Sequence, residues 1–186
     1  MEFVAVIGDR GSGKSNLMSG LLYTHYCQGW KIIANYTLNF PAHLMSFTEI
    51  AKLGPEIQDA YIGLDELSEG ADSYDFFAKN VRKINRLISQ IRKRNCRVYY
   101  TDQRLHKIAK RLRSLTDGFI LMEDLDRDKE GHNFENCASH FRATFLNDRL
   151  DTIKVLVFNG RPFQGLYNSK ELIVGYPDPV LTDTVD

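Results

Sequence analysis

A glycine-rich segment near the amino terminus has the residue types and spacing of a phosphate-binding loop. Residues 8–15 read Gly-Asp-Arg-Gly-Ser-Gly-Lys-Ser and match the pattern G-x-x-x-x-G-K-[ST] between an apolar strand and a segment of helical spacing. Glycines let backbone N–H groups wrap a phosphate, and the helix start adds partial positive charge. Lys14 would reach the β- and γ-phosphates, and Ser15 would ligate Mg²⁺. The pattern predicts an ATP site formed by Gly8, Asp9, Arg10, Gly11, Ser12, Gly13, Lys14, Ser15 and Asn16.

Two adjacent acids follow a second short apolar segment. Asp65 and Glu66 come directly after residues 61–64, Tyr-Ile-Gly-Leu. Asp65 would hold Mg²⁺ directly or through water, and Glu66 could polarise a water for attack on the γ-phosphate. The pair favours hydrolysis, because a kinase gains nothing from a base that activates water. A pair of acids at a helix start is the alternative interpretation.

A third polar position follows another apolar segment. Residues 98–101 read Val-Tyr-Tyr-Thr and precede Asp102 and Gln103. If this strand lies between the other two, as in RecA-like sheets of order 5-1-4-3-2, its end points at the γ-phosphate. Gln103 would then act as a sensor that hydrogen-bonds the phosphate and the attacking water. The alternative role of Gln103 is to cap the basic helix that follows.

Hydrophobic periodicity predicts the elements that must position these residues. Strands are expected at 2–7, 31–36, 61–64, 98–101 and 119–122, and helices at 14–27, 47–53, 74–94 and 105–115. The alternation predicts a parallel sheet between helices, a three-layer αβα fold. Segments 140–146 and 152–158 flank Asn-Asp-Arg and predict a hairpin at the sheet edge. We expect one domain over 1–186, with a nucleotide-binding core at 1–126 and the hairpin and acidic tail at 127–186.

The composition indicates a globular protein with segregated charge. The 186 residues are 43% hydrophobic and 26% charged, and 24 basic residues balance 24 acidic ones. Twelve basic residues fall within 82–113, against the single acid Asp102. This basic band comprises Arg82, Lys83, Arg86, Arg92, Lys93, Arg94, Arg97, Arg104, Lys107, Lys110, Arg111 and Arg113. It is either a solvated helix face or a contact for a polyanion.

The sequence shows no run long enough for a membrane-spanning helix and no secretory signal, so a cytoplasmic location without membrane insertion is expected. The three cysteines, Cys27, Cys96 and Cys137, form no CxxC pair and are expected to be buried thiols.

Taken together, the motifs resemble the FtsK/HerA superfamily of DNA-pumping ATPases, and within it the compact genome-packaging ATPases of archaeal viruses. Residues 92–95, Arg-Lys-Arg-Asn, fit the R-[KH]-x-[GN] turn of that branch, eleven residues before Gln103. The resemblance implies that Arg92 acts in catalysis on a neighbouring subunit, with Arg86 and Arg94 as rival candidates. Asn95 replaces the usual glycine, which is tolerable because asparagine visits left-handed conformations.

The resemblance implies an ATP-hydrolysing motor with a RecA-like core of the ASCE type. It would form a homo-oligomeric ring, a hexamer or pentamer, and drive double-stranded DNA into a viral capsid without sequence preference. A capsid or portal vertex protein would be its partner, and the virion would be a second location beside the host cytoplasm. Two alternatives stay open: a small-molecule or nucleotide kinase, and a nucleotide-switched assembly or partition factor. Zonula occludens toxin-like assembly ATPases of filamentous phages share these motifs but usually carry a membrane segment.

Overall fold

The described strands of the protein form one twisted sheet. The computed structural model describes residues 2–52, 54, 56–67, 90, 91, 93–103, 110–126 and 140–168, with 110–112 described by their backbone. The strands follow the order β3-β2-β4-β5-β1-β6-β7-β8. They are β1 (Phe3–Ile7), β2 (Lys31–Ala34), β3 (His43–Leu44), β4 (Ala60–Leu64), β5 (Arg97–Asp102), β6 (Gly118–Asp124), β7 (His140–Asn147) and β8 (Thr152–Asn159). The helices whose bounds lie within the described residues are α1 (Lys14–Cys27), α2 (Phe47–Lys52), α4 (Lys110–Leu115) and the 3₁₀ helix η1 (Arg161–Leu166).

The strand order confirms the predicted fold class. The five strands expected from the sequence correspond to β1, β2, β4, β5 and β6, and they pair in parallel in the order 5-1-4-3-2. The predicted hairpin is also present, because β7 pairs antiparallel with β6 and with β8. The two-residue strand β3, parallel to β2, was not predicted. It is too short to leave a periodic signal in the sequence.

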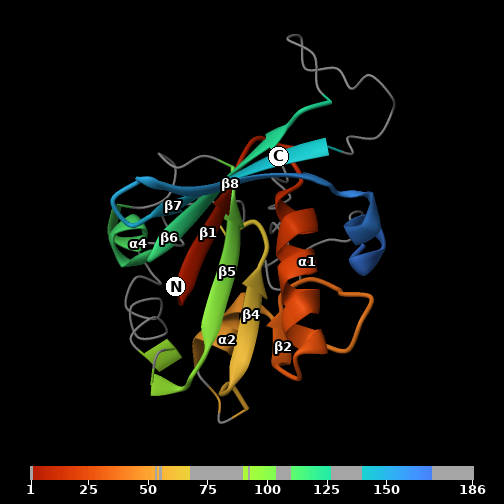
Figure 1. Cartoon of the computed structure of the whole chain (residues 1–186). Coiled ribbons are helices and arrows are strands. Elements are labelled where there is room, and N and C mark those ends of the chain that lie inside the picture. The colour runs from red at the N-terminus through yellow and green to blue at the C-terminus, as the bar shows by residue number, and fades with distance from the viewer. Residues whose placement is uncertain are drawn as a thin grey trace, which may run out of the picture.

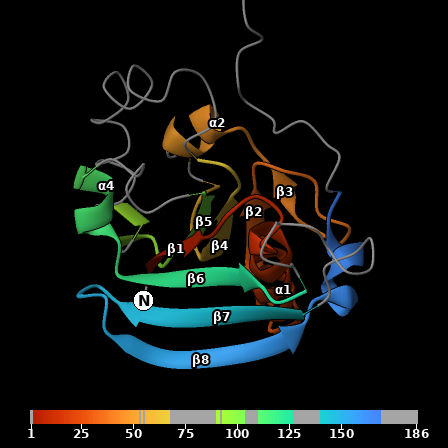
Figure 2. The ribbon, with the colours of Figure 1, turned by 90° about the horizontal axis from the view of Figure 1, so that it is seen from above.

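Helices cover both faces of the central strands (Figures 1 and 2). Alternate residues of β1 point to opposite faces, as strand geometry requires. Phe3, Ala5 and Ile7 join a core cluster with α2, whereas Val4 and Val6 join one with Leu17 of α1. This two-sided burial explains why the central strands read as continuous apolar runs instead of an alternating pattern.

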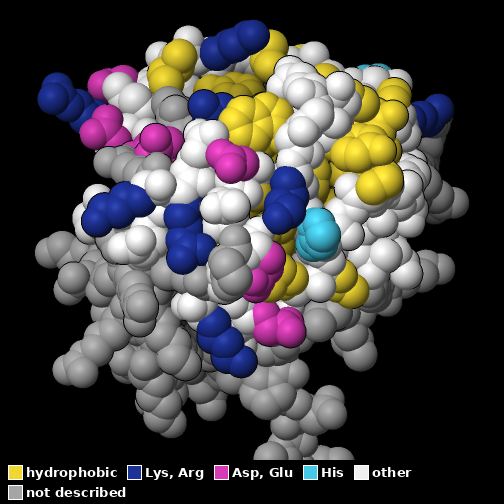
Figure 3. All heavy atoms as spheres, turned by 90° about the horizontal axis from the view of Figure 1, so that it is seen from below, with side chains coloured by type: hydrophobic (Ala, Val, Ile, Leu, Met, Phe, Trp, Pro, Cys, Tyr) yellow, Lys and Arg dark blue, Asp and Glu magenta, His cyan; other side chains and the backbone are white. Residues whose placement is uncertain are grey.

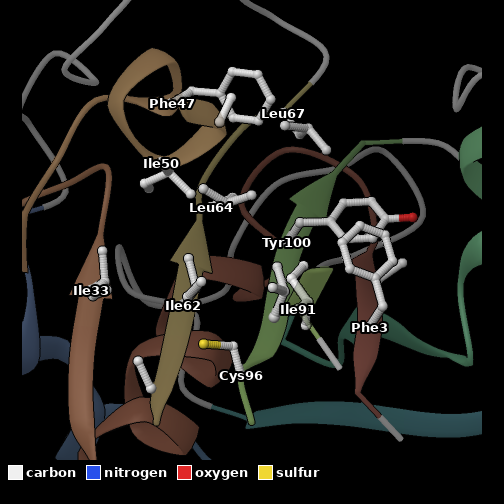
Figure 4. Packing of buried hydrophobic residues seen from close by; sticks show 14 of the residues in the cluster. Phe3, Ile33, Phe47, Ile50, Ile62, Leu64, Leu67, Ile91, Cys96 and Tyr100 are labelled. Carbon is white, nitrogen blue, oxygen red and sulfur yellow. The ribbon is translucent and has the colours of Figure 1, made fainter. Parts of the chain in front are cut away.

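The short helix α2 is defined by its cap and its apolar face. The Ser46 hydroxyl and the Glu49 carboxylate form a capping box, in which the Ser46 N–H donates to Glu49 Oε2 at 2.7 Å. Figure 4 shows Ile50 of α2 beside Leu64 and Phe47 beside Leu67. The predicted helix at 47–53 is therefore confirmed within the described residues.

Two other expectations have different outcomes. Cys96 is buried as expected, but Cys27 is exposed at the end of α1, so the expectation of buried thiols is wrong there. Cys137 and most of the predicted helix 74–94 lie outside the described residues, although Gln90, Ile91 and Lys93 are helical. In the described part of the chain, no helix combines the length and the apolar character needed to span a membrane.

Packing around β4 gives a test of the fold. Ile62 is fully buried in this strand, so Ile62→Ala should lower the free energy of unfolding by about 2–5 kcal/mol. Ile153 lies on β8 with 58% of its surface exposed, so Ile153→Ala should change it by no more than about 0.5 kcal/mol. Urea unfolding of both variants measures the contrast. Equal losses in the two variants would contradict this placement of β4 and β8.

Candidate functional site

The phosphate-binding loop joins the carboxyl end of β1 to the start of α1. Gly11 and Gly13 have φ values of 81° and 80°, in the left-handed region that glycine adopts without a steric cost. The Ser12 N–H donates to the Asp9 carbonyl at 3.1 Å and closes the loop. Helix α1 begins after Gly13 with no side-chain cap and no acid in its first turn. The helix end is therefore open to an anion that can accept from backbone N–H groups.

Lys14 folds back over this loop. Its Nζ donates to the Asp9 carbonyl at 3.0 Å, and the residue is buried, with 9% of its surface exposed. A buried ammonium needs close acceptors, because removal from water disfavours its charge. Phosphate oxygens in the loop would be stronger acceptors than a backbone carbonyl, because both partners of the hydrogen bond would then be charged. The side chain is thus placed to turn from Asp9 to a bound phosphate.

The carboxyl-terminal hairpin supports the loop from behind. A Cβ atom added to Gly13 would lie 2.8 Å from the Phe141 ring, and one added to Gly160 would lie 2.4 Å from it. Phe141 of β7 therefore occupies the space beside both glycines. The Asn16 side chain donates to the Gly160 carbonyl at 3.0 Å, so its amide group holds this junction. The sequence motif identified Gly13 and Asn16, but nothing local to it indicated Phe141 or Gly160.

Asp65 lies directly against the loop. The Ser15 hydroxyl is 2.9 Å from both carboxylate oxygens of Asp65, and the Thr101 hydroxyl donates to Oδ1 at 2.5 Å. Burial raises the pKa of the Asp65 carboxyl, while the hydrogen bonds from Thr101 and Ser15 and the charge of Lys14 oppose the shift. The structure thus brings together Ser15 and Asp65, the two residues predicted from separate motifs to bind the metal.

The oxygen atoms of Ser15 and Asp65 fit the ligand preference of a magnesium ion. Mg²⁺ prefers hard oxygen ligands and is commonly held by one or two carboxylates together with substrate phosphates and water. The Asp65 carboxylate and the Ser15 hydroxyl supply two such oxygens at the loop. A divalent cation beside them would also offset the cost of the buried negative charge of Asp65.

The turn after β4 carries Glu66 in an uncommon backbone conformation. Glu66 has a φ of 50°, which costs a non-glycine residue of the order of 1 kcal/mol. Its N–H donates to Thr101 Oγ1 at 2.8 Å, and the Leu67 N–H donates to the Thr101 carbonyl at 3.2 Å. Glu66 is partly exposed. The predicted role of Glu66 as general base stays a prediction.

Asn35 is a site residue that our sequence reasoning missed. It follows β2 directly and is buried, with 3% of its surface exposed. Its Oδ1 accepts the Asp65 N–H at 2.7 Å, and its Nδ2 donates to the Asp65 carbonyl at 3.1 Å. The predicted strand 31–36 included Asn35, whereas β2 ends at Ala34, so Asn35 is the first residue after the strand at the same sheet edge as Asp65.

Gln103 lies where the predicted strand order puts it. Strand β5 pairs with β1 and with β4, and the Gly8 N–H donates to the Asp102 carbonyl at 3.3 Å. Gln103 is the next residue, is partly exposed, and donates its backbone N–H to Asp102 Oδ1 at 2.7 Å. The backbone of Gln103 therefore lies next to Gly8, the first glycine of the loop. Its role as a sensor of the γ-phosphate stays a prediction.

The arginine candidates have different outcomes. Arg92 and Arg86 lie outside the described residues. Arg94 donates through Nη1 to the carbonyls of Gly54 and Ile57, at 2.7 and 3.1 Å, and so holds the segment that follows α2. Asn95 has a φ of 52°, the left-handed conformation expected for the residue that replaces glycine in this turn. These contacts give Arg94 a structural role, and the proposed role of Arg92 or Arg86 on a neighbouring subunit stays a prediction.

Only part of the basic band has described side chains: Lys93, Arg94, Arg97 and Arg113. Arg97 lies over the rings of Trp30 and Tyr61, 5.6 and 5.4 Å from their centroids, and donates to the Tyr61 hydroxyl. Figure 3 views the end of the sheet opposite the loop, where basic and acidic side chains of the described residues are interspersed around apolar ones. On that end, the described surface is of mixed charge.

Comparisons with known proteins find similarity in structure and none in sequence. No protein-family model matches the sequence, and no curated protein matches it. The N-terminal domain of zonular occludens toxin from Neisseria meningitidis is 13% identical, with a TM-score of 0.59 over 90% of this chain and 100% of that one. The genome packaging NTPase B204 from Sulfolobus turreted icosahedral virus 2, in complex with ATP-gammaS, is 10% identical, with a TM-score of 0.57 over 85% and 96%. The same protein with AMP gives 11% and 0.53 over the same shares.

At these identities the likeness shows the fold, which is the α/β fold of P-loop NTPases with an antiparallel hairpin after the parallel strands. Both kinds of protein named in the sequence resemblance, an archaeal-virus packaging NTPase and a zonula occludens toxin domain, are among the structural neighbours.

The buried carboxyl of Asp65 predicts a stability effect of Asp65→Asn. Because folding raises this pKa above its ordinary value of 3.8, the folded state retains the proton to higher pH than the unfolded chain. The wild-type free energy of unfolding therefore falls as pH rises through the folded-state pKa. An uncharged asparagine keeps hydrogen-bonding capacity toward Ser15 and Thr101 and avoids this loss.

The measurement is urea unfolding in EDTA without nucleotide. Asp65→Asn should unfold at higher urea than the wild type at pH 7, and the difference should shrink on acidification. A lower midpoint for the variant at pH 7 would show that the hydrogen bonds outweigh the burial of the charge.

Proposed function

We propose that the chain hydrolyses ATP with Mg²⁺ and uses the energy to move double-stranded DNA in the packaging of a viral genome. The observation that carries the hydrolytic part is the contact between the Ser15 hydroxyl and the Asp65 carboxylate at a phosphate-binding loop. Such a pair, one group from the helix after the loop and one from the end of a parallel strand, is the metal-side half of a P-loop hydrolase.

In the proposed reaction, residues 8–16 bind the triphosphate through backbone N–H groups, and Lys14 leaves the Asp9 carbonyl to bind the β- and γ-phosphates. Ser15 and Asp65 would hold Mg²⁺, which neutralises charge on the phosphates when bound. Glu66 accepts a proton from a water that attacks the γ-phosphorus, while the bond from this phosphorus to the β–γ bridging oxygen breaks and ADP leaves. Gln103 orients this water and contacts the γ-phosphate.

The motor part of the proposal rests on charge and on fold likeness. The structural neighbour B204 is described as a genome packaging NTPase and was solved with ATP-gammaS. The basic band holds half of the 24 basic residues of this chain, as suits phosphate contacts along a channel. We propose a hexameric or pentameric ring in which Arg92 completes the neighbouring subunit's site, with a capsid or portal vertex protein as partner. The ring would act in the host cytoplasm and associate with the virion.

A second candidate function is a nucleotide-switched assembly factor. The observation that favours it is the match to the zonular occludens toxin domain, whose whole length this chain covers. Such a factor would use the same ATP site to change its contacts with other proteins. DNA would then have no effect on turnover, and this difference separates the two candidates.

Substitutions of Lys14 and Glu66 should have different effects on nucleotide binding and turnover. Lys14→Ala should abolish nucleotide binding, because Lys14 would contact the phosphates themselves. Glu66→Gln should keep binding and lose turnover by about 10²–10⁴-fold, the usual cost of a missing general base. ATP binding by calorimetry and phosphate release measure the two effects. Near wild-type phosphate release by Glu66→Gln would contradict the hydrolytic assignment of this carboxylate.

Duplex DNA should stimulate ATP turnover regardless of sequence. Binding should weaken steeply with salt, because each phosphate contact contributes about 0.9 to the slope of log affinity against log salt concentration. Two unrelated duplexes of equal length, at several salt concentrations, test both points, and a DNA-free sample is the control. Turnover that DNA leaves unchanged, with no salt-dependent binding, would favour the assembly factor.

A further inference from the structure

The Asn35 side chain extends the pairing of β2 with β4 beyond the ends of both strands. The last backbone pair of the two strands joins Ala34 and Gly63, and the Asn35 N–H still donates to the Gly63 carbonyl at 3.2 Å. From there the side chain replaces the backbone: its amide accepts from the N–H of Asp65 and donates to the carbonyl of Asp65. A carboxamide has one acceptor and one donor side, so it can pair with a residue as a neighbouring strand would.

This pairing is needed because the chain leaves the strand geometry at the next residue. Glu66 has a φ of 50°, and such a conformation persists only where surrounding contacts fix it. Thr101 fixes it from the β5 side by accepting the Glu66 N–H at 2.8 Å. Asn35 fixes it from the β2 side through both polar backbone groups of Asp65. The turn that carries both acids is therefore held between two neighbouring strands.

The next residue ties the same strand end to the phosphate-loop helix. The Tyr36 hydroxyl is buried and lies 3.0 Å from the Ser19 hydroxyl on α1. Ser19 is one helical turn after Ser15, which contacts Asp65. The end of β2 thus fixes the acid-bearing turn through Asn35 and the helix that supplies the metal-binding hydroxyl through Tyr36.

We propose that Asn35 is a positioning residue for ATP hydrolysis, which holds the Asp65–Glu66 turn so that Asp65 meets the metal and Glu66 meets the attacking water. This inference rests on the proposed hydrolytic function. Both hydrogen bonds of the Asn35 side chain go to the backbone of Asp65, so we expect Asn35 to act through that residue. Its removal should therefore change turnover and metal dependence more than nucleotide affinity.

The test compares Asn35→Ala and Asn35→Asp with wild type and with Asn39→Ala. Asn39 is a matched control, because this exposed residue also donates its Nδ2 to a backbone carbonyl, that of Gly165, at 2.8 Å. Asn35→Asp keeps the volume and the acceptor for the Asp65 N–H and replaces the donor. Each protein is measured for melting temperature, ATP affinity in EDTA, kcat, and the Mg²⁺ concentration that gives half-maximal turnover.

We expect both Asn35 variants to bind ATP in EDTA as the wild type does, to lose about 10²-fold in kcat, and to need more Mg²⁺. Asn39→Ala should match the wild type in all of these. Wild-type kcat and Mg²⁺ dependence in a folded Asn35 variant would overturn the positioning role alone. Loss of folding in both variants, or an equal loss of affinity and kcat, would make Asn35 a purely structural residue. Absence of turnover in the wild type would overturn the hydrolytic function, and this inference with it.

Discussion

The burial of one carboxylate determines how the site is built. Asp65 has 9% of its surface exposed, and a charge removed from water must be met by donors or by a cation. The donors come from Ser15 on α1 and Thr101 on β5, which are 50 and 36 residues away along the chain. The fold must therefore bring both hydroxyls to the buried carboxylate of Asp65. The strand order is the first feature of the fold that does so.

The order of the parallel strands satisfies this constraint. Because β5 lies between β1 and β4, the residues after all three strands meet at one edge of the sheet. That edge receives the loop from β1, Asp65 and Glu66 from β4, and Gln103 from β5. Strand β2 contributes Asn35 at the same edge, one position further along the sheet. A single topological rule thus accounts for the proposed chemical groups and for the residue that holds two of them.

The same rule explains how far sequence reasoning can reach. The loop motif is local, and Asp65 follows a recognisable apolar strand, so the positions of both are predictable from the sequence alone. The position of Phe141 is not predictable in this way. Its contact with Gly13 joins segments distant along the chain, and its contact with Gly160 depends on close packing. The expectation for Cys27 was wrong for a related reason: which side of α1 is exposed near its end depends on what packs against it. Asn35 was missed because the predicted strand ran to residue 36, two residues beyond the observed end of β2 at Ala34.

The antiparallel strands do more than widen the sheet. Strand β7 places the Phe141 ring where a side chain on Gly13 or on Gly160 would clash, and Asn16 is hydrogen-bonded to the Gly160 carbonyl. The phosphate loop and the end of the hairpin therefore share one packed junction. Close-packed groups transmit small displacements because they leave no space in which to absorb them. The loop at Gly13 and strand β7 are therefore fixed relative to each other by the Phe141 ring, and β7 pairs in turn with β8, the exposed edge strand of this sheet.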